Sequence, residues 1–194
     1  DAAADNAGWH RPRRTVAGTR PLAAGGTVPV TGYRIRPASE SDGPALYELW
    51  QGLRQHNATV DRRVIPAPVA ESEFIVDFRE VLARPRSAAF VAALDTSLAG
   101  FIAGTIERNL PDRLPQEHAT VGYLWVEERF RRQGIARALF AEVTGWARTQ
   151  NGVSHFEMAV LSADDAAAGF WRSIGFSPFI ERLWAPLGGA EEDA

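Results

Sequence analysis

The sequence of 194 residues contains no cysteine and no lysine, and all 21 of its basic residues are arginines. Without cysteine the chain can form no disulfide, no thiolate metal site and no cysteine nucleophile. Without lysine it lacks the lysine of a P-loop and the lysine that forms a Schiff base, which excludes pyridoxal-phosphate chemistry. A cysteine nucleophile and a lysine Schiff base are therefore both excluded.

Long apolar runs and a strong charge imbalance are also missing. No run reaches the roughly 18 apolar residues that cross a bilayer, and the N-terminus lacks the apolar core of a signal peptide, so we expect a cytoplasmic protein without membrane contact. A net charge of −3 gives no general attraction to nucleic acid. His10 and His155 stand in no metal-binding pattern, so we expect no bound metal.

The length predicts one domain with a flexible end on each side. Residues 1–31 are rich in Ala, Gly, Pro and Arg and lack periodicity, which is typical of an extension without a core of its own. Residues 188–194 form an acidic tail. We therefore expect a single domain over residues 32–187.

Hydrophobic periodicity within that domain predicts strands and helices in a mixed order. Strands are predicted at 33–37, 88–94, 98–108, 118–126, 154–161 and 176–184, and helices at 45–53, 69–83, 135–150 and 165–175. A polar loop is expected over residues 55–68. The order favours an α/β (α+β) domain whose sheet is largely antiparallel, with one parallel crossover around the helix at 135–150.

One stretch organises the chain, namely the predicted strand at 118–126 and the basic turn that leads into the next helix. The turn is Arg131-Arg132-Gln133-Gly134-Ile135-Ala136. The first N–H groups of a helix have no intrahelical acceptor, and the helix dipole adds positive potential there. Gly134 lets a bulky anion approach the backbone. The turn therefore predicts an anion-binding site.

Two motifs resemble those of the GCN5-related N-acetyltransferase (GNAT) family. Arg131-x-x-Gly134-x-Ala136 is similar to that family's R/Q-x-x-G-x-G/A pyrophosphate loop, and Phe170-Trp171-x-x-x-Gly175-Phe176 is similar to its L/F-Y-x-x-x-G-F motif. The resemblance covers about residues 33 to 184. It implies a GNAT fold, in which a mixed, mostly antiparallel sheet of about six to seven strands is flanked by about four helices.

The resemblance also implies an acetyl-CoA-dependent N-acetyltransferase in which a primary amine attacks the thioester directly in a ternary complex. The pantetheine arm would pair with the backbone of the central strand, and the Leu124 N–H would polarise the thioester carbonyl. The pyrophosphate would bind the N–H groups of Arg132 to Arg137. The cofactor-binding residues so implied are Leu124, Trp125, Val126, Arg131, Arg132, Gln133, Gly134, Ile135, Ala136, Arg137, Asp164, Phe170 and Trp171.

Three positions depart from the family pattern. Trp171 stands where many members have a tyrosine acid, Asp164 where asparagine is frequent, and Thr120 where a glutamate base is often found. His118 lies two residues before Thr120 and so on the same strand face. His118 and Glu107 are therefore the candidate general bases, with Glu117 as a further one.

The acceptor is left open by the sequence. His56 and Asp61 lie in the segment after the first predicted helix, near which family acceptors bind, and are expected on the substrate side. Antibiotics, polyamines, amino acids, peptide N-termini and protein lysines all fit. Two alternatives stay open beside the acetyltransferase: a non-catalytic acyl-CoA-binding or sensing module, and an acyltransferase for a longer acyl-CoA. An exposed last strand would allow a homodimer.

Overall fold

The computed structural model describes residues 32–186, and the expected extension at 1–31 and the acidic tail at 188–194 lie outside this range. The described elements are β1 (Arg34–Pro37), η1 (Glu40–Asp42), α1 (Gly43–Val60), α2 (Glu71–Ala83), β2 (Ser87–Ala93), β3 (Leu98–Arg108), β4 (Glu117–Val126), η2 (Glu128–Phe130), α3 (Ile135–Arg148), β5 (Val153–Glu157) and α4 (Asp165–Ser173). Among them, no helix is long and apolar enough to cross a membrane.

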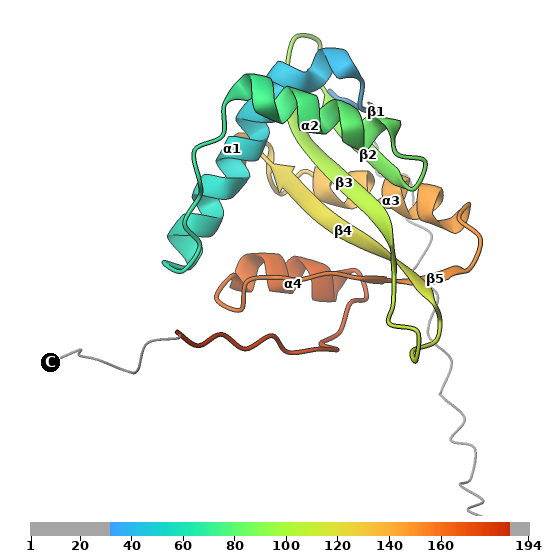
Figure 1. The fold of residues 1–194 in the computed structure, drawn as a ribbon. Helices are drawn as coiled ribbons and strands as arrows, with labels where there is room; N and C mark the ends of the chain where they lie inside the picture. Colours follow the sequence, from blue (N-terminus) through green and yellow to red (C-terminus); the bar gives the residue numbers. More distant parts are fainter. Residues whose placement is uncertain (1–31, 187–194) are drawn as a thin grey trace, which may run out of the picture.

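The five described strands form one sheet in the order β1-β2-β3-β4-β5. Each neighbouring pair is antiparallel except β4 and β5, which run parallel and are joined through α3. Figure 1 shows α1 and α2 on one face of this sheet and α3 on the other. The predicted mixed, mostly antiparallel α/β architecture with four helices is confirmed, whereas a sheet of six to seven strands is not.

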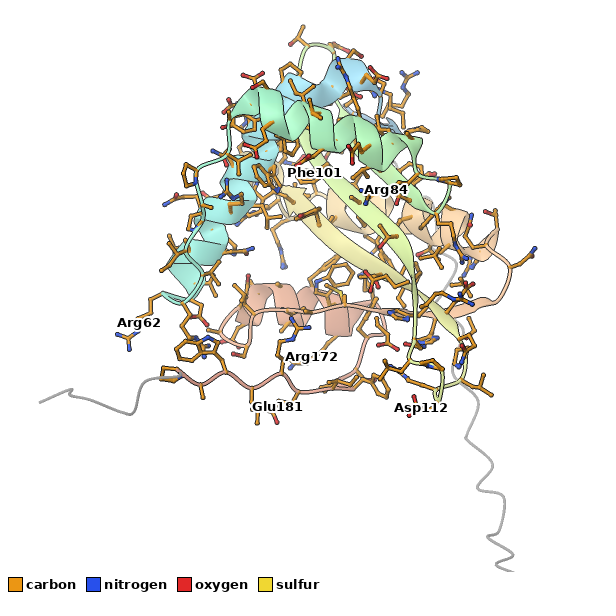
Figure 2. All side chains as sticks on the ribbon, viewed as in Figure 1. Arg62, Arg84, Phe101, Asp112, Arg172 and Glu181 are labelled. Carbon is orange, nitrogen blue, oxygen red and sulfur yellow. The ribbon has the colours of Figure 1, made fainter. Side chains whose placement is uncertain are left out.

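Each face of the sheet carries its own apolar cluster. On the α3 face, Ile135, Leu139 and Val143 recur every four residues and are at most 1% exposed. Full burial of such a side chain contributes roughly 1.5–3 kcal/mol. On the other face Phe101 of β3 packs beneath α1 and α2 together with Leu46, as Figure 2 shows for Phe101. The two clusters hold the sheet between the helix layers.

A carboxylate fixes the connection from β1 to α1. Arg36 donates two hydrogen bonds of 2.7 Å to Asp42, which also accepts the Ser39 N–H at 2.8 Å. These bonds, led by those from Arg36, lower the pKa of Asp42 to about 2. The charged pair therefore anchors the first strand to the first helix at neutral pH.

β4 contains one extra residue. Ala103 pairs with Tyr123 and Gly104 with Val121, so Gly122 has no partner on β3. Such a β-bulge changes the side-chain alternation of the strand. Val121 packs into the cluster under α3, whereas Tyr123 contacts Phe101 on the opposite face with ring centroids 6.4 Å apart.

β4 and β5 separate partway along their length. Their pairing runs from Glu117 with Val153 to Thr120 with Glu157, where β5 ends. Within the described part of the chain, residues 121–126 of β4 therefore continue without a strand on the β5 side. The predicted strand at 154–161 is four residues too long, because residues 158–161 diverge from β4 and form the far wall of a cavity.

Two further boundaries differ from the sequence-based expectation. α1 continues to Val60 and ends with the Asp61 N–H donating to the Asn57 carbonyl, because residues 55–60 of the expected loop include neither Gly nor Pro. The predicted strand at 176–184 is wrong: this segment has neither helix nor strand. Pro178 lacks an N–H, and the large apolar residues 179, 180, 183 and 184 are 63–82% exposed, so the segment has no half-buried surface to favour a strand.

Candidate active site

A cavity of about 760 Å³ occupies the opening between β4 and the chain beyond β5. Five parts of the chain form its wall: the second half of α1, residues 121–126 of β4, the turn at 130–137, residues 158–161 and α4. All predicted cofactor-binding residues except Gln133 line it. The cavity thus joins the basic turn to the open side of the central strand.

The open side of β4 exposes backbone hydrogen-bonding groups to this cavity. The Glu127 N–H donates to the Ala99 carbonyl of β3 at 3.0 Å, whereas the Val126 carbonyl accepts from Arg131 Nε at 3.0 Å. The backbone groups of Val126 therefore face away from β3. Because these directions alternate along a strand, those of Leu124 face the same way. The Leu124 N–H is thus available to a ligand in the cavity.

The basic turn has the backbone conformation of an anion-binding loop. Gly134 is the N-cap of α3 with φ 83°, and Arg132 has φ 63°, so the backbone of both residues adopts the left-handed conformation. The N–H groups of the first turn of α3 have no intrahelical acceptor and carry the positive end of the helix dipole. Tyr33 fixes the turn from β1's side by donating to Gln133 Oε1 at 3.0 Å. These features fit a pyrophosphate group.

The arginines of the turn differ in their contacts. Arg132 and Arg137 are exposed and border the cavity, which suits charge neutralisation of a bound anion. Arg131 instead places its guanidinium over the Trp125 ring, 4.6 Å from the ring centroid, while its Nε donates to the Val126 carbonyl. Its charge therefore lies at the end of β4, near the middle of the cavity wall.

A histidine and a carboxylate meet across the cavity. His56 of α1 and Asp164, the N-cap of α4, form a contact of 2.9 Å between Nε2 and Oδ2, and the His56 ring lies 5.4 Å from that of Trp125. Burial raises the pKa of Asp164, but hydrogen bonds from the Ala167 N–H and His56 outweigh it and lower the pKa overall. Asp164 is therefore ionised at neutral pH.

Sequence reasoning named both members of this pair but did not connect them. It assigned Asp164 to the cofactor and His56 to the substrate. The two residues are 108 positions apart, and no local pattern signals their contact. The sequence signal is limited to the position of Asp164 before a helix, since Asp is a favoured N-cap residue. In the structure, Asp164 accepts the Ala167 N–H at 2.9 Å.

The candidate bases of the central sheet lie elsewhere. His118, Glu107 and Glu117 occupy the end of β3 and β4 where β5 is paired, and none of them lines the cavity. His118 Nε2 is 4.0 Å from Glu107 Oε2, and its buried Nδ1 has no partner within residues 32–186. Glu117 is held by two hydrogen bonds of 2.7 Å from Arg86, which lower its pKa. A base role for any of the three stays a prediction.

Asp61 also lies outside the cavity lining. It immediately follows α1 and accepts hydrogen bonds from the backbone and side chain of Arg63, whose side-chain contacts lower the Asp61 pKa to about 2. The neighbouring Arg62 projects outward from the end of α1 (Figure 2). A substrate role for Asp61 stays a prediction, while His56 borders the cavity.

Trp171 fills the position of the missing tyrosine. It is 6% exposed, and its ring packs edge-on against Phe140 and Phe176, with centroids 5.5 and 5.0 Å away. It also borders the cavity. An indole N–H is a hydrogen-bond donor but not an acid near neutral pH, so Trp171 shapes the wall without supplying a proton.

These features coincide with a known family. The sequence profile of the acetyltransferase (GNAT) family matches residues 45–176, and the chain belongs to this family. No functionally curated protein matches the sequence closely enough to compare.

Solved structures share the fold at low sequence identity. A mutant of the BH1408 protein from Bacillus halodurans is 18% identical with a TM-score of 0.70, over 79% of this chain and 99% of that one. The aminoglycoside 6'-N-acetyltransferase AAC(6')-IG from Acinetobacter haemolyticus is 17% identical with a TM-score of 0.63. The match covers 80% of this chain and 98% of that one. The aminoglycoside N-acetyltransferase AAC(6')-Iy, solved in complex with CoA, is 19% identical with a TM-score of 0.61. The match covers 79% of this chain and 93% of that one.

Proposed function

We propose that the protein is an acetyl-CoA-dependent N-acetyltransferase that transfers acetyl to a primary amine by direct attack in a ternary complex. The observation that carries this proposal is that one cavity contains both the unpaired side of β4 and the left-handed basic turn before α3. A cavity with both features suits acetyl-CoA, in which a pantetheine arm joins a diphosphate to a thioester.

The backbone of the cavity supports the polarisation of a thioester. The Leu124 N–H would donate to the thioester carbonyl as negative charge develops on its oxygen. The Val126 N–H would pair with the pantetheine arm, since the Val126 carbonyl already accepts from Arg131 Nε, and the α3 N-terminus would hold the pyrophosphate. Catalysis would then rest mainly on positioning the amine beside the thioester carbon.

The missing tyrosine acid does not oppose this reading. The leaving group is a thiolate whose thiol titrates only modestly above neutrality, so water can supply its proton. Removal of a proton from the amine is the harder step, since an alkylammonium with a pKa of about 10 is largely protonated at neutral pH. The protein therefore needs a base more than it needs an acid.

The absence of cysteine gives a direct assay. A thiol reagent added to the purified protein reports only released CoA, because the chain has no thiol of its own. We expect thiol release from acetyl-CoA with at least one amine from a panel of aminoglycosides, polyamines, amino acids and peptides. Propionyl-CoA and butanoyl-CoA in the same assay measure the acyl length that the cavity accepts.

The lost tyrosine favours a second candidate, a non-catalytic acyl-CoA-binding module. Calorimetry with acetyl-CoA and CoA separates the two. Binding together with amine-dependent thiol release supports the enzyme. Binding without release across the panel supports the module, and the absence of binding overturns both.

A further inference from the structure

We infer that His56 and Asp164 form the proton-accepting dyad of this site, with the imidazole Nδ1 of His56 as the general base and Asp164 as the residue that positions it. The inference rests on the proposed acetyl transfer and names the group that deprotonates the amine. It departs from the expectation that His118 or Glu107 does so, since neither borders the cavity.

The first argument is geometric. His56 borders the same cavity as Leu124, whose N–H faces the expected thioester, and 29% of the His56 side chain remains exposed. Asp164 is held in place because its Oδ1 accepts the Ala167 N–H at 2.9 Å, which leaves Oδ2 for His56 Nε2. The carboxylate is therefore a fixed partner, and the imidazole keeps access to a substrate.

The second argument concerns the tautomer of His56. An ionised carboxylate only accepts hydrogen bonds, so the His56 nitrogen beside Asp164 must carry the proton. Nδ1 then holds the lone pair, and it has no hydrogen-bond partner among residues 32–186. A carboxylate that fixes the tautomer and stabilises the imidazolium is the arrangement that makes a histidine an effective base.

Within residues 32–186, two charged side chains lie near the ring, one before α4 and one in the basic turn. Asp164 of α4 contacts His56 directly, and Arg131 lies over the Trp125 ring that His56 also contacts. The negative charge of Asp164 is therefore in direct contact with the ring, whereas the positive charge of Arg131 contacts the indole. Among the described residues that line the cavity, His56 is the one histidine and Asp164 the one carboxylate.

The proton balance is simple. Nδ1 takes a proton from the substrate ammonium, and the neutral nitrogen attacks the thioester carbonyl carbon. A C–N bond forms, the C–S bond breaks, and the leaving thiolate takes the proton that the imidazolium carries. The second proton of the attacking nitrogen passes to water, so ammonium and acetyl-CoA yield acetamide, CoA thiol and one proton.

The test compares His56→Gln with His155→Gln. His155 is a matched control because its Nε2 also lies 2.9 Å from a carboxylate, Glu157, but outside the cavity lining. With the best amine of the panel, we expect His56→Gln to lower kcat/KM about a hundredfold at pH 7, and His155→Gln to leave it unchanged. The Kd for CoA, measured by calorimetry, should stay the same in both.

The pH profile separates a base from a structural contact. The deficit of His56→Gln should shrink toward pH 10, where the amine loses its proton unaided. Asp164→Asn keeps the N-cap, because Asn caps helices as well as Asp does. It should lower kcat and move the acidic limb of the profile to lower pH, since removal of a neighbouring negative charge disfavours the imidazolium.

Three results would overturn the inference. His56→Gln could raise only the KM for the amine, which would make His56 a substrate contact. His118→Gln could remove the acidic limb while His56→Gln retains it, which would make His118 the base. The unsubstituted protein could bind CoA and release no thiol with any amine, which would overturn the proposed function itself and with it the dyad.

Discussion

Gly134 offers a quantitative test of the cofactor position. It is the N-cap of α3 with φ 83°, a conformation that costs most L-residues roughly 1–2 kcal/mol. Asn and Asp tolerate it best and have nearly the same shape. A comparison of Gly134→Asn with Gly134→Asp therefore holds backbone strain and side-chain volume constant and changes only the charge.

The expected effect of that charge can be worked out. A carboxylate at this position would lie within about 5 Å of an anion on the neighbouring N–H groups, and two unit charges at that distance repel by about 3 kcal/mol at an effective dielectric constant of 20. This corresponds to roughly a hundredfold weaker binding. We expect Gly134→Asn to bind CoA within about tenfold of the original chain, and Gly134→Asp about a hundredfold more weakly than Gly134→Asn.

Calorimetry at two salt concentrations completes this experiment. The gap between the two variants should narrow as salt rises, because exposed charges are screened. Circular dichroism checks that both variants stay folded. Equal Kd values for Gly134→Asn and Gly134→Asp would place the pyrophosphate away from the α3 N-terminus and refute the assignment of the turn.

Two further predictions concern stability. The pKa of Asp42 is lowered from 3.8 to about 2, and its side chain is 8% exposed. Its ionisation therefore contributes about 2 kcal/mol to the free energy of unfolding above pH 4, and this contribution is lost as the pH falls through 2. Urea unfolding should therefore show Asp42→Asn destabilised at pH 7 but not at pH 2, and a deficit independent of pH would contradict this. Trp171→Phe should keep most of the acetyl-transfer activity, because the Trp171 ring acts through packing. Trp171→Ala should instead lower the free energy of unfolding by about 3–5 kcal/mol. Loss of turnover in a stably folded Trp171→Phe variant would give the indole a chemical role.

The elements with strong periodicity were predictable from sequence alone. The stripe of Ile135, Leu139 and Val143 marks α3, and apolar β-prone residues mark the central strand that ends at Val126. The basic turn with Gly134 at the start of α3 was also readable, because cap chemistry and glycine usage are local properties. The position and conformation of the turn could therefore be predicted, while its role as an anion site stays a prediction.

Features that depend on a distant partner were not predictable. Residues 176–184 have the composition of a strand, but strand formation needs a neighbour, and none pairs with this segment in residues 32–186. The contact of His56 with Asp164 depends on how α1 and α4 are placed around the cavity. The sequence likewise suggested Arg131 as an anion ligand, and only the fold places it over Trp125.

The extra residue at Gly122 also bears on how this chain can tolerate insertions and deletions. Removal of Gly122 would make β4 regular without exchanging any faces, because Val121 and Tyr123 already pair with the adjacent β3 residues Gly104 and Ala103. Trp125 would keep its face and the N–H of Leu124 would still point away from β3, but the strand would lose the local bend and extra twist that the bulge gives it. A deletion of one residue would thus keep the chemistry of the site and change only the course of β4 between its paired half and the half that lines the cavity.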